Sequence, residues 1–255
     1  MTRDLQLALE LADLADELTL SRFRALDLVV ESKPDMTPVS EADHAAEEPM
    51  RRRIRSARPD HAVLGEEGGL DGPDGASCRW VLDPIDGTKN YVRGIPVYGT
   101  LIALQRDGRT EVGVVSAPAL GRRWWAATGA GAFADGHAIH VSKVASIADA
   151  HLSYASLTGW DERGLGPQFG ALARRFWRTR AFGDFWQHML VAEGAIDVAL
   201  EPEVSLWDLA ALQVIVEEAG GRFTDLDGRA WPEGGNAVSS NGVLHDEVLV
   251  SLAAG

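Results

Sequence analysis

The sequence predicts a mixed α/β protein, with an α+β first half and an α/β second half. From Leu7 to Leu18, leucines recur at the three- and four-residue spacing of an amphipathic helix. Two continuous apolar runs, 97–105 and 112–116, flank a short Asp-Gly turn, which indicates an antiparallel hairpin. From Ala150 onward, short apolar runs alternate with helical patterns, and this alternation is typical of an α/β half.

The two halves are expected to meet near residue 143, where the composition shows no linker. Residues 1–143 are expected to carry metal-binding motifs. Residues 144–255 are expected to complete the metal site and the substrate pocket. Because no flexible segment separates them, the halves are expected to share an interface and to enclose a cleft.

Two helices are expected before the first strand. Residues 2–31 fit one long helix or a helical hairpin. After a loop broken by two prolines, Ser40 and Asp43 stand three residues apart, as in a capping pair. The helix that they begin should run to about Ala57, with a kink or interruption at Pro49. The basic run in this helix is expected on a solvated face: Arg51, Arg52, Arg53 and Arg55.

The sheet of the first half is expected from short apolar runs bounded by turn residues. These runs are 61–64, 80–86, 97–105, 112–116, 124–128 and 138–141. In the second half, strands are expected near 152–155, 179–181, 196–200, 222–224 and 237–239. Helices are expected near 169–177, 183–191, 207–220 and 246–254.

Composition narrows the functional class. The chain has 255 residues and a formal net charge of −14, so bulk binding to a nucleic-acid backbone is not expected. Cys78 is the single cysteine, which excludes an internal disulfide and a cysteine zinc site. The first ten residues lack the apolar core of a signal peptide, and no apolar run approaches the roughly 18 residues of a membrane span. A cytoplasmic protein without membrane contact is therefore expected.

The stretch 80–90 carries the strongest chemical signal. It reads as a buried strand that ends in Asp83 and Asp86, followed by Gly87, Thr88 and the start of a helix. Two carboxylates at a strand end can converge on a cation. Free backbone amides at a helix start suit an anion such as phosphate. The stretch therefore predicts a metal site beside a phosphate-binding turn.

Further acids fall at the ends of other expected elements. Glu66 follows the strand at 61–64, and Asp208 begins the helix at 207–220. Taken alone, the Gly65-Glu66-Glu67 segment fits an ordinary loop equally well. Carboxylates without nearby histidine or cysteine favour Mg²⁺ or Mn²⁺ over zinc. One aspartate that bridges two such ions would make a two-metal site for phosphoryl transfer.

Together these motifs resemble the inositol monophosphatase superfamily of magnesium-dependent phosphatases. The resemblance covers nearly the whole chain, and its most specific parts are the Asp-Pro-Ile-Asp-Gly-Thr string and the downstream Trp-Asp pair. The matching segments are Lys33-x-Asp35-x-Thr37-Pro38-Val39-x-x-x-Asp43, Gly65-Glu66-Glu67, Asp83-Pro84-Ile85-Asp86-Gly87-Thr88, Gly129-x-Gly-Ala-Phe133 and Trp207-Asp208-x-Ala210. The resemblance implies a layered αβαβα, sugar-phosphatase-like fold, a homodimer and a small phosphate monoester as substrate.

The resemblance also implies a ligand set for two or three Mg²⁺ ions. Glu66, Asp83 and the carbonyl of Ile85 would hold the first ion. Asp83, Asp86 and Asp208 would hold the second, with Asp83 as the bridge. A third, weaker ion would lie near Glu66.

Further roles follow from the same resemblance. Thr88, hydrogen-bonded to Asp43, would orient and deprotonate the water that attacks phosphorus. Lys33 lies on the loop that closes over the site in relatives, although a solvated lysine fits equally well. Catalysis is thus assigned to Asp43, Glu66 and Thr88. Substrate contact is assigned to Glu66, Ile85, Asp86, Gly87, Thr88, Gly183, Asp184, Glu201 and Asp208.

The resemblance places the alcohol side of the substrate at two places, Gly183-Asp184-Phe185 and Glu201. Inositol-specific relatives usually carry glycine, a hydroxyl residue and alanines at the first of these two places, where this chain has the carboxylate of Asp184. Two carboxylates suit a cationic alcohol, and L-histidinol phosphate carries an ammonium and an imidazole. The Gly183-Asp184 pair and the Gly-Glu-Glu-Gly-Gly context at 65–69 resemble the histidinol-phosphatase branch of the superfamily. This resemblance implies hydrolysis of L-histidinol phosphate in histidine synthesis.

Several alternatives stay open. Asp184 could serve only as the N-cap of the helix from Phe185 to Val191. The substrate could be inositol 1-phosphate or another sugar or nucleotide phosphate. A non-catalytic relative is the different-class alternative, but such a protein is expected to have lost a ligand, and every ligand of the motif is present here.

Overall fold

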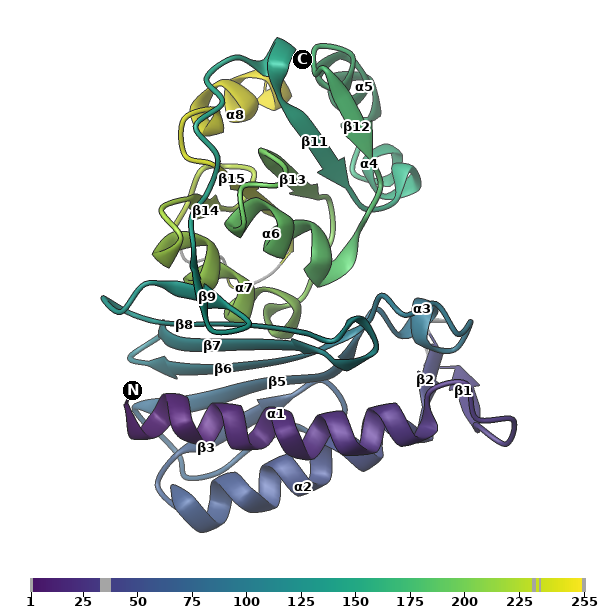
Figure 1. Ribbon diagram of the computed structural model, residues 1–255, viewed down its shortest axis with the longest axis vertical. Coiled ribbons are helices and arrows are strands. Elements are labelled where there is room, and N and C mark those ends of the chain that lie inside the picture. The colour runs from purple at the N-terminus through teal and green to yellow at the C-terminus, as the bar shows by residue number, and fades with distance from the viewer. Residues whose placement is uncertain (1, 33–37, 231–232, 234, 254–255) are drawn as a thin grey trace.

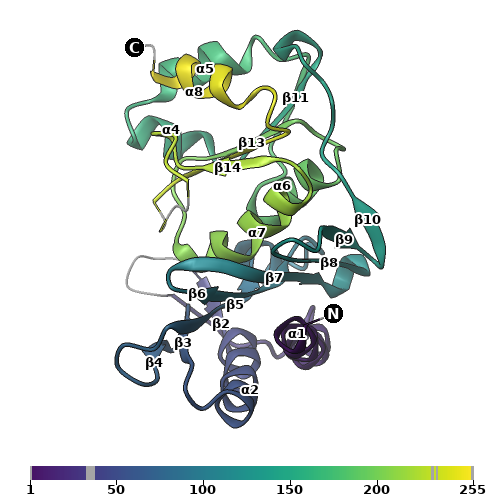
Figure 2. The same cartoon turned by 90° about the vertical axis from the view of Figure 1, so that its left-hand side faces the viewer.

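The computed structural model describes residues 2–32, 38–230, 233 and 235–253 (Figure 1). These residues form five layers in the order αβαβα, and the two views agree on that order (Figures 1 and 2). The layered fold expected from the sequence is therefore confirmed. Lys33, expected on a loop that closes over the site, lies outside the described residues together with part of its motif.

The first layer is a pair of helices, α1 (Arg3–Arg22) and α2 (Glu41–Ala57), on the lower face of the first sheet (Figure 1). The segment 2–31 contains one helix, not a hairpin, and that helix ends at Arg22. Helix α2 has the predicted ends. It continues through Pro49, so the predicted interruption does not occur.

The second layer is an eight-stranded sheet that is antiparallel except for one pair. Its strands, in spatial order, are β10 (His137–Ile139), β9 (Ala132–Ala134), β8 (Arg122–Ala127), β7 (Arg109–Ala117), β6 (Gly99–Arg106), β5 (Cys78–Asp86), β3 (Ala62–Gly65) and β4 (Gly69–Asp71). Strands β3 and β5 are parallel, with Gly65 opposite Leu82. The residue that follows β3 therefore lies beside the acidic end of β5. That residue is Glu66, and its amide donates to the Leu82 carbonyl (3.1 Å).

Helices α6 (Asp184–Ala192) and α7 (Leu206–Glu218) form the middle layer between the two sheets (Figure 2). The second sheet has the order β12 (Arg178–Arg180), β11 (His151–Tyr154), β13 (Val198–Glu201), β15 (Ala237–Ser240) and β14 (Arg222–Thr224). The outer layer consists of α4 (Leu157–Glu162), α5 (Gly166–Ala173) and α8 (His245–Ala253). A two-stranded sheet, β1 (Val30–Ser32) and β2 (Pro38–Ser40), and the short helix α3 (Thr88–Tyr91) lie at the side.

The largest core cluster lies between the first sheet and the middle helices. Trp124 from β8 and Phe185 from α6 are both buried there, with ring centroids 6.1 Å apart. Burying each such side chain contributes about 1.5–3 kcal/mol. Because residues of both halves share this cluster, it fixes α6 and α7 over the sheet. The division of the chain at residue 143 stays a prediction.

Among the described helices, none combines the length and the apolar composition that a membrane span requires.

Candidate active site

Three aspartates, two from β5 and one from the distant helix α7, meet at the carboxyl end of β5. Carboxylate oxygens of Asp83, Asp86 and Asp208 lie within 4.8 Å of one another. Asp83 and Asp86 are 1% and 8% exposed, and Asp208 is half-buried. We expected from the sequence that these three acids would lie in one metal site, and the structure brings them together.

An irregularity in β5 allows both of its aspartates to face α7. In a regular strand, Asp83 and Asp86 would point to opposite faces because their positions differ by an odd number, three. The pairing of β5 with β6 shifts register between these two positions. At the shift, Pro84 has no N–H to donate, and its carbonyl accepts a hydrogen bond from the Thr100 hydroxyl (2.8 Å). The Ile85 amide turns inward and donates to Asp83 Oδ1 (3.0 Å).

Helix N-termini surround the other two aspartates. Asp208 is the third residue of α7, and its Oδ2 accepts from the Ser205 amide (2.6 Å), as in a capping box. Asp86 Oδ2 accepts from the amide of Phe185 in the first turn of α6 (2.7 Å). Two helix dipoles thus direct their positive ends at this cluster, which partly offsets the repulsion between its charges.

The clustered carboxylates repel one another, and a bound cation would relieve this repulsion. Burial, followed by the negative charge of Glu66, raises the pKa of Asp83 well above its usual range. Burial and then Asp184 raise the pKa of Asp86 in the same direction, and burial raises the pKa of Asp208 to about 6. Within the described part of the chain, no Lys or Arg forms an ion pair with the three clustered aspartates. A set of carboxylate oxygens with no His or Cys in the group fits a hard divalent ion.

Thr88 lies at the first position of α3, next to two acceptors. Its hydroxyl donates to the Ile85 carbonyl (2.9 Å) and lies 3.4 Å from Asp43 Oδ1. Asp43 is buried in the first turn of α2, where its other oxygen accepts from the amide of Ser40 (2.8 Å). Burial raises the pKa of Asp43 to about 6. Gly87, which precedes Thr88, has φ +80°, a conformation that favours glycine.

Asp184 and Glu201 place two further acids next to the clustered aspartates. Asp184 is the first residue of α6, and its Oδ2 accepts from the Asn90 side chain (3.0 Å). A Cβ built on Gly87 would lie 3.4 Å from that same oxygen. Glu201 ends β13, is 4% exposed and accepts from the Gln187 side chain. Burial, followed by the charge of Asp184, raises the pKa of Glu201 well above its usual range.

The N-cap alternative for Asp184 is wrong. Helix α6 has Gly183 as its N-cap, with Asp184 inside the first turn at φ +49°. Glycine at 183 has φ +71°, so the backbone turns sharply before the helix begins. The carboxylate that accepts from the Phe185 amide belongs to Asp86, not to Asp184.

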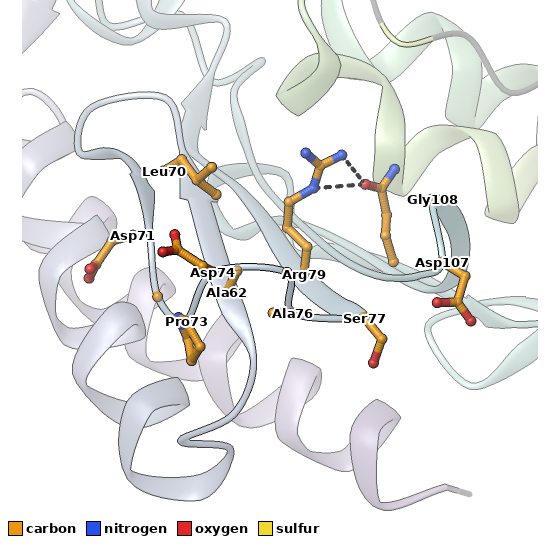
Figure 3. Close-up of a pocket in the computed structure, with 13 residues that line it drawn as sticks. Ala62, Leu70, Asp71, Pro73, Asp74, Ala76, Ser77, Arg79, Asp107 and Gly108 are labelled. Carbon is orange, nitrogen blue, oxygen red and sulfur yellow. Dashed lines mark hydrogen bonds between the residues drawn. The ribbon is translucent and has the colours of Figure 1, made fainter.

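A separate open pocket of about 590 Å³ lies at the other end of β5. It is lined by residues 70–77, which run from β4 into the following loop, together with Ala62, Arg79, Gln105, Asp107 and Gly108 (Figure 3). The Arg79 guanidinium is directed at the Gln105 side chain and donates to Oε1 from both Nε (3.2 Å) and Nη2 (2.7 Å). None of the candidate site residues lines this pocket, so it is not part of the acidic site.

Three residues near the site were not expected from the sequence: Asn90, Glu47 and Arg51. Asn90 follows the Asp-Pro-Ile-Asp-Gly-Thr string, and that proximity was a usable signal. Glu47 and Arg51 have the i, i+4 spacing of a helical ion pair, but such spacing is also common on solvated faces. Arg51 is 4% exposed, which corrects the prediction that the whole basic run lies on a solvated face.

A five-layered αβαβα fold with clustered carboxylates at a strand end is typical of metal-dependent sugar-phosphatase-like proteins. Comparison with known proteins specifies the family. The model of the inositol monophosphatase family matches residues 1–254, so this chain belongs to that family.

Individual relatives agree with this assignment. The chain is 58% identical to a histidinol-phosphatase from Mycobacterium tuberculosis, over 99% of this chain and 98% of that protein. It is also 58% identical to a histidinol-phosphatase from Streptomyces coelicolor, over 96% of this chain and 95% of that protein. Among solved structures, an IMPase from Thermotoga maritima superposes with a TM-score of 0.89 at 31% identity, covering 99% of this chain and 97% of the other.

Proposed function

We propose that this protein is a metal-dependent phosphomonoesterase that hydrolyses L-histidinol phosphate to L-histidinol and phosphate. The observation that carries the proposal is the 58% identity, over nearly the full length of both chains, to two histidinol-phosphatases. The acidic cluster and the additional carboxylates beside it supply the chemistry that this reaction needs.

The cations would be held by oxygen ligands at the end of β5. The residues are Glu66, Asp83, Asp86 and Asp208, with the carbonyl of Ile85. Magnesium is the ion we propose, two or three per site, with Mn²⁺ as an alternative, because hard oxygen ligands favour both. When bound, such ions lower the pKa of water and neutralise negative charge on the phosphoryl oxygens.

Protein groups would orient and deprotonate the attacking water. The Thr88 hydroxyl, 3.4 Å from Asp43 Oδ1, is close enough to pass a proton towards that carboxylate after a small rotation. The raised pKa of Asp43, about 6 because of burial, suits a group that accepts a proton near neutral pH. The amides of Gly87 and Thr88 would donate to the phosphoryl oxygens.

The alcohol side would be recognised by charge. Asp184 and Glu201 are buried carboxylates beside the cluster, and an ammonium or imidazolium would be attracted to them. The sharp turn at Gly183 would set the direction of Asp184. An uncharged polyol such as inositol 1-phosphate would leave both carboxylates without a counter-charge, and that cost disfavours it.

The proposal includes a homodimer, a cytoplasmic location and no nucleic-acid or membrane partner. The acidic net charge of −14 supports the absence of a nucleic-acid partner. The dimer and the location rest on the sequence resemblance.

Steady-state phosphate release tests this function. With Mg²⁺ present, kcat/KM for L-histidinol phosphate is expected to exceed that for inositol 1-phosphate by at least tenfold. Chelation should abolish both activities. Asp83→Asn should be inactive, whereas Asp227→Asn, an exposed surface control, should match the wild type. Equal or greater efficiency on the inositol ester would refute the substrate assignment and leave the phosphatase assignment intact.

A further inference from the structure

Glu47 and Arg51 form a buried ion pair on the inner face of α2. The two side chains are 3% and 5% exposed, and Arg51 Nε lies 2.6 Å from Glu47 Oε1. Ionised groups at this depth are retained only with full hydrogen bonding. The partners that complete this bonding lie outside the helix.

Those partners belong to the turn that follows β3. Glu47 Oε2 accepts from the amide of Glu67 (2.9 Å), and Oε1 accepts from the amide of Gly68 (2.8 Å). Arg51 Nη2 donates to the carbonyl of Gly69 (2.6 Å). Three consecutive residues, the last two of the turn and the first of β4, are therefore bonded to one ion pair on α2.

The glycines of this turn fit the ion pair closely. A Cβ on Gly65 would lie 2.4 Å from Glu47 Oε1, and a Cβ on Gly68 would lie 2.7 Å from Arg51 Nη2. Real Cβ atoms do not approach other heavy atoms so closely, so the carboxylate and the guanidinium occupy the space that glycine leaves. The Gly-Glu-Glu-Gly-Gly segment is thus shaped around Glu47 and Arg51.

Glu66 lies between two fixed points of this arrangement. On one side its amide is bonded to Leu82 of β5 (3.1 Å), and on the other the Glu67 amide is bonded to Glu47. We propose that Glu47 and Arg51 are positioning residues that hold the backbone of Glu66 so that its carboxylate meets the cation beside Asp83. The inference rests on the proposed function, in which Glu66 is a metal ligand.

A purely structural role makes a different prediction. Removing one partner of a buried pair lowers stability wherever the pair lies. A positioning role also lowers metal affinity, because residues that orient metal ligands typically contribute 10–100-fold to affinity. Measurements of metal affinity and of the local rigidity of the turn therefore distinguish a positioning role from a purely structural one.

The test compares two ion pairs on the same helix. Glu47→Gln alters the buried pair. Glu48→Gln alters the neighbouring pair Glu48–Arg52, whose side chains are 53% and 63% exposed. Mg²⁺ binding is measured by titration calorimetry, and amide hydrogen exchange is followed in the peptide that spans 65–69. For Glu47→Gln we expect Mg²⁺ affinity to fall at least tenfold and exchange to accelerate. Glu48→Gln should change neither.

Gly68→Ala provides a second variant if Glu47→Gln does not fold. Gly68 is exposed and lies outside the positive-φ region, so alanine fits its backbone while its Cβ displaces the Arg51 guanidinium. We expect weaker Mg²⁺ binding here as well. Faster exchange with unchanged Mg²⁺ affinity would overturn the positioning role and leave the proposed function standing. A wild type that binds no Mg²⁺ would refute the proposed function, and the positioning role with it.

Discussion

The side chain of Asn90 donates a hydrogen bond to Asp184, with Nδ2 and Oδ2 3.0 Å apart. The same nitrogen donates to the Val97 carbonyl (2.9 Å), so both amide hydrogens of Asn90 are used. Asp184 has φ +49°, a conformation that costs a non-glycine residue roughly 1 kcal/mol or more. Asn90 therefore connects the Asp-Pro-Ile-Asp-Gly-Thr segment to the carboxylate that we propose recognises the substrate cation.

Asn90→Ala is expected to weaken recognition of the cationic alcohol. Without the amide, Asp184 is freer to leave its strained conformation. We expect KM for L-histidinol phosphate to rise about tenfold, which corresponds to about 1.4 kcal/mol. KM for p-nitrophenyl phosphate, which carries no cation, should change less than twofold. Equal losses for both esters would mean that Asn90 supports the fold of the site and not its selectivity.

Asp184→Asn removes the charge and retains the shape. Its amide can still fill the same space beside Asn90. If Asp184 attracts the ammonium or imidazolium of the substrate, kcat/KM for L-histidinol phosphate should fall at least tenfold more than that for p-nitrophenyl phosphate. The comparison is made at saturating Mg²⁺, because Asp184 lies close to Asp86. A uniform loss would contradict a recognition role.

Asp83→Asn is expected to abolish activity and to increase the stability of the metal-free protein. Asp83 is 1% exposed, and the charges of Glu66 and Asp86 repel its carboxylate. An amide at this position keeps the bond from the Ile85 amide and removes one buried charge. In the presence of a chelator, we expect urea unfolding to give the variant a free energy of unfolding about 1–3 kcal/mol higher than that of the wild type. The turnover of the variant should be abolished. Lower stability than the metal-free wild type would show that the repulsion argument is wrong.

The sequence predicted most of the site because its acids fall at element ends in specific motifs. Asp83, Asp86 and Asp208 were identified in this way, and the layered fold followed from the resemblance that they carry. The pairs Asn90–Asp184 and Glu47–Arg51 were not predicted. Each depends on packing between elements that the linear pattern does not place relative to one another. Strands β4 and β9 were also missed, because each is short and lies in a segment punctuated by glycines.

Because His188 is buried, we expect the protein to lose stability in mild acid. It is 1% exposed, its Nδ1 lies 2.8 Å from the Ser239 hydroxyl, and burial lowers its pKa to about 3. In the unfolded chain the pKa is about 6.5. The unfolded state therefore binds an extra proton between about pH 6.5 and pH 3. The contribution is fully present above pH 6.5 and is lost as the pH falls, by roughly 1–2 kcal/mol at pH 5.

The measurement is urea unfolding of the Mg²⁺-loaded protein from pH 8 to pH 5. His188→Gln should flatten this dependence, because glutamine has no proton to gain. A parallel pH dependence in wild type and variant would assign the acid sensitivity to other groups.

Gly113 allows β7 and α7 to approach each other closely. A Cβ at this position would lie 2.5 Å from the backbone carbonyl oxygen of Ala211 and 2.6 Å from Val214 Cγ1. Because the first of these contacts is backbone, the helix would have to move away from the sheet. Helix α7 also carries Asp208 at its N-terminus, so this movement would disturb the acidic cluster as well as the core. For Gly113→Ala we expect a loss of about 1–3 kcal/mol in the free energy of unfolding and weaker Mg²⁺ binding.

Gly170→Ala is the control, since its Cβ would meet only the flexible end of Arg174 at 3.6 Å within helix α5. It should leave Mg²⁺ binding unchanged and stabilise the protein by up to about 1 kcal/mol. Normal Mg²⁺ affinity in a destabilised Gly113→Ala would mean that the position of Asp208 does not depend on the contact between β7 and α7.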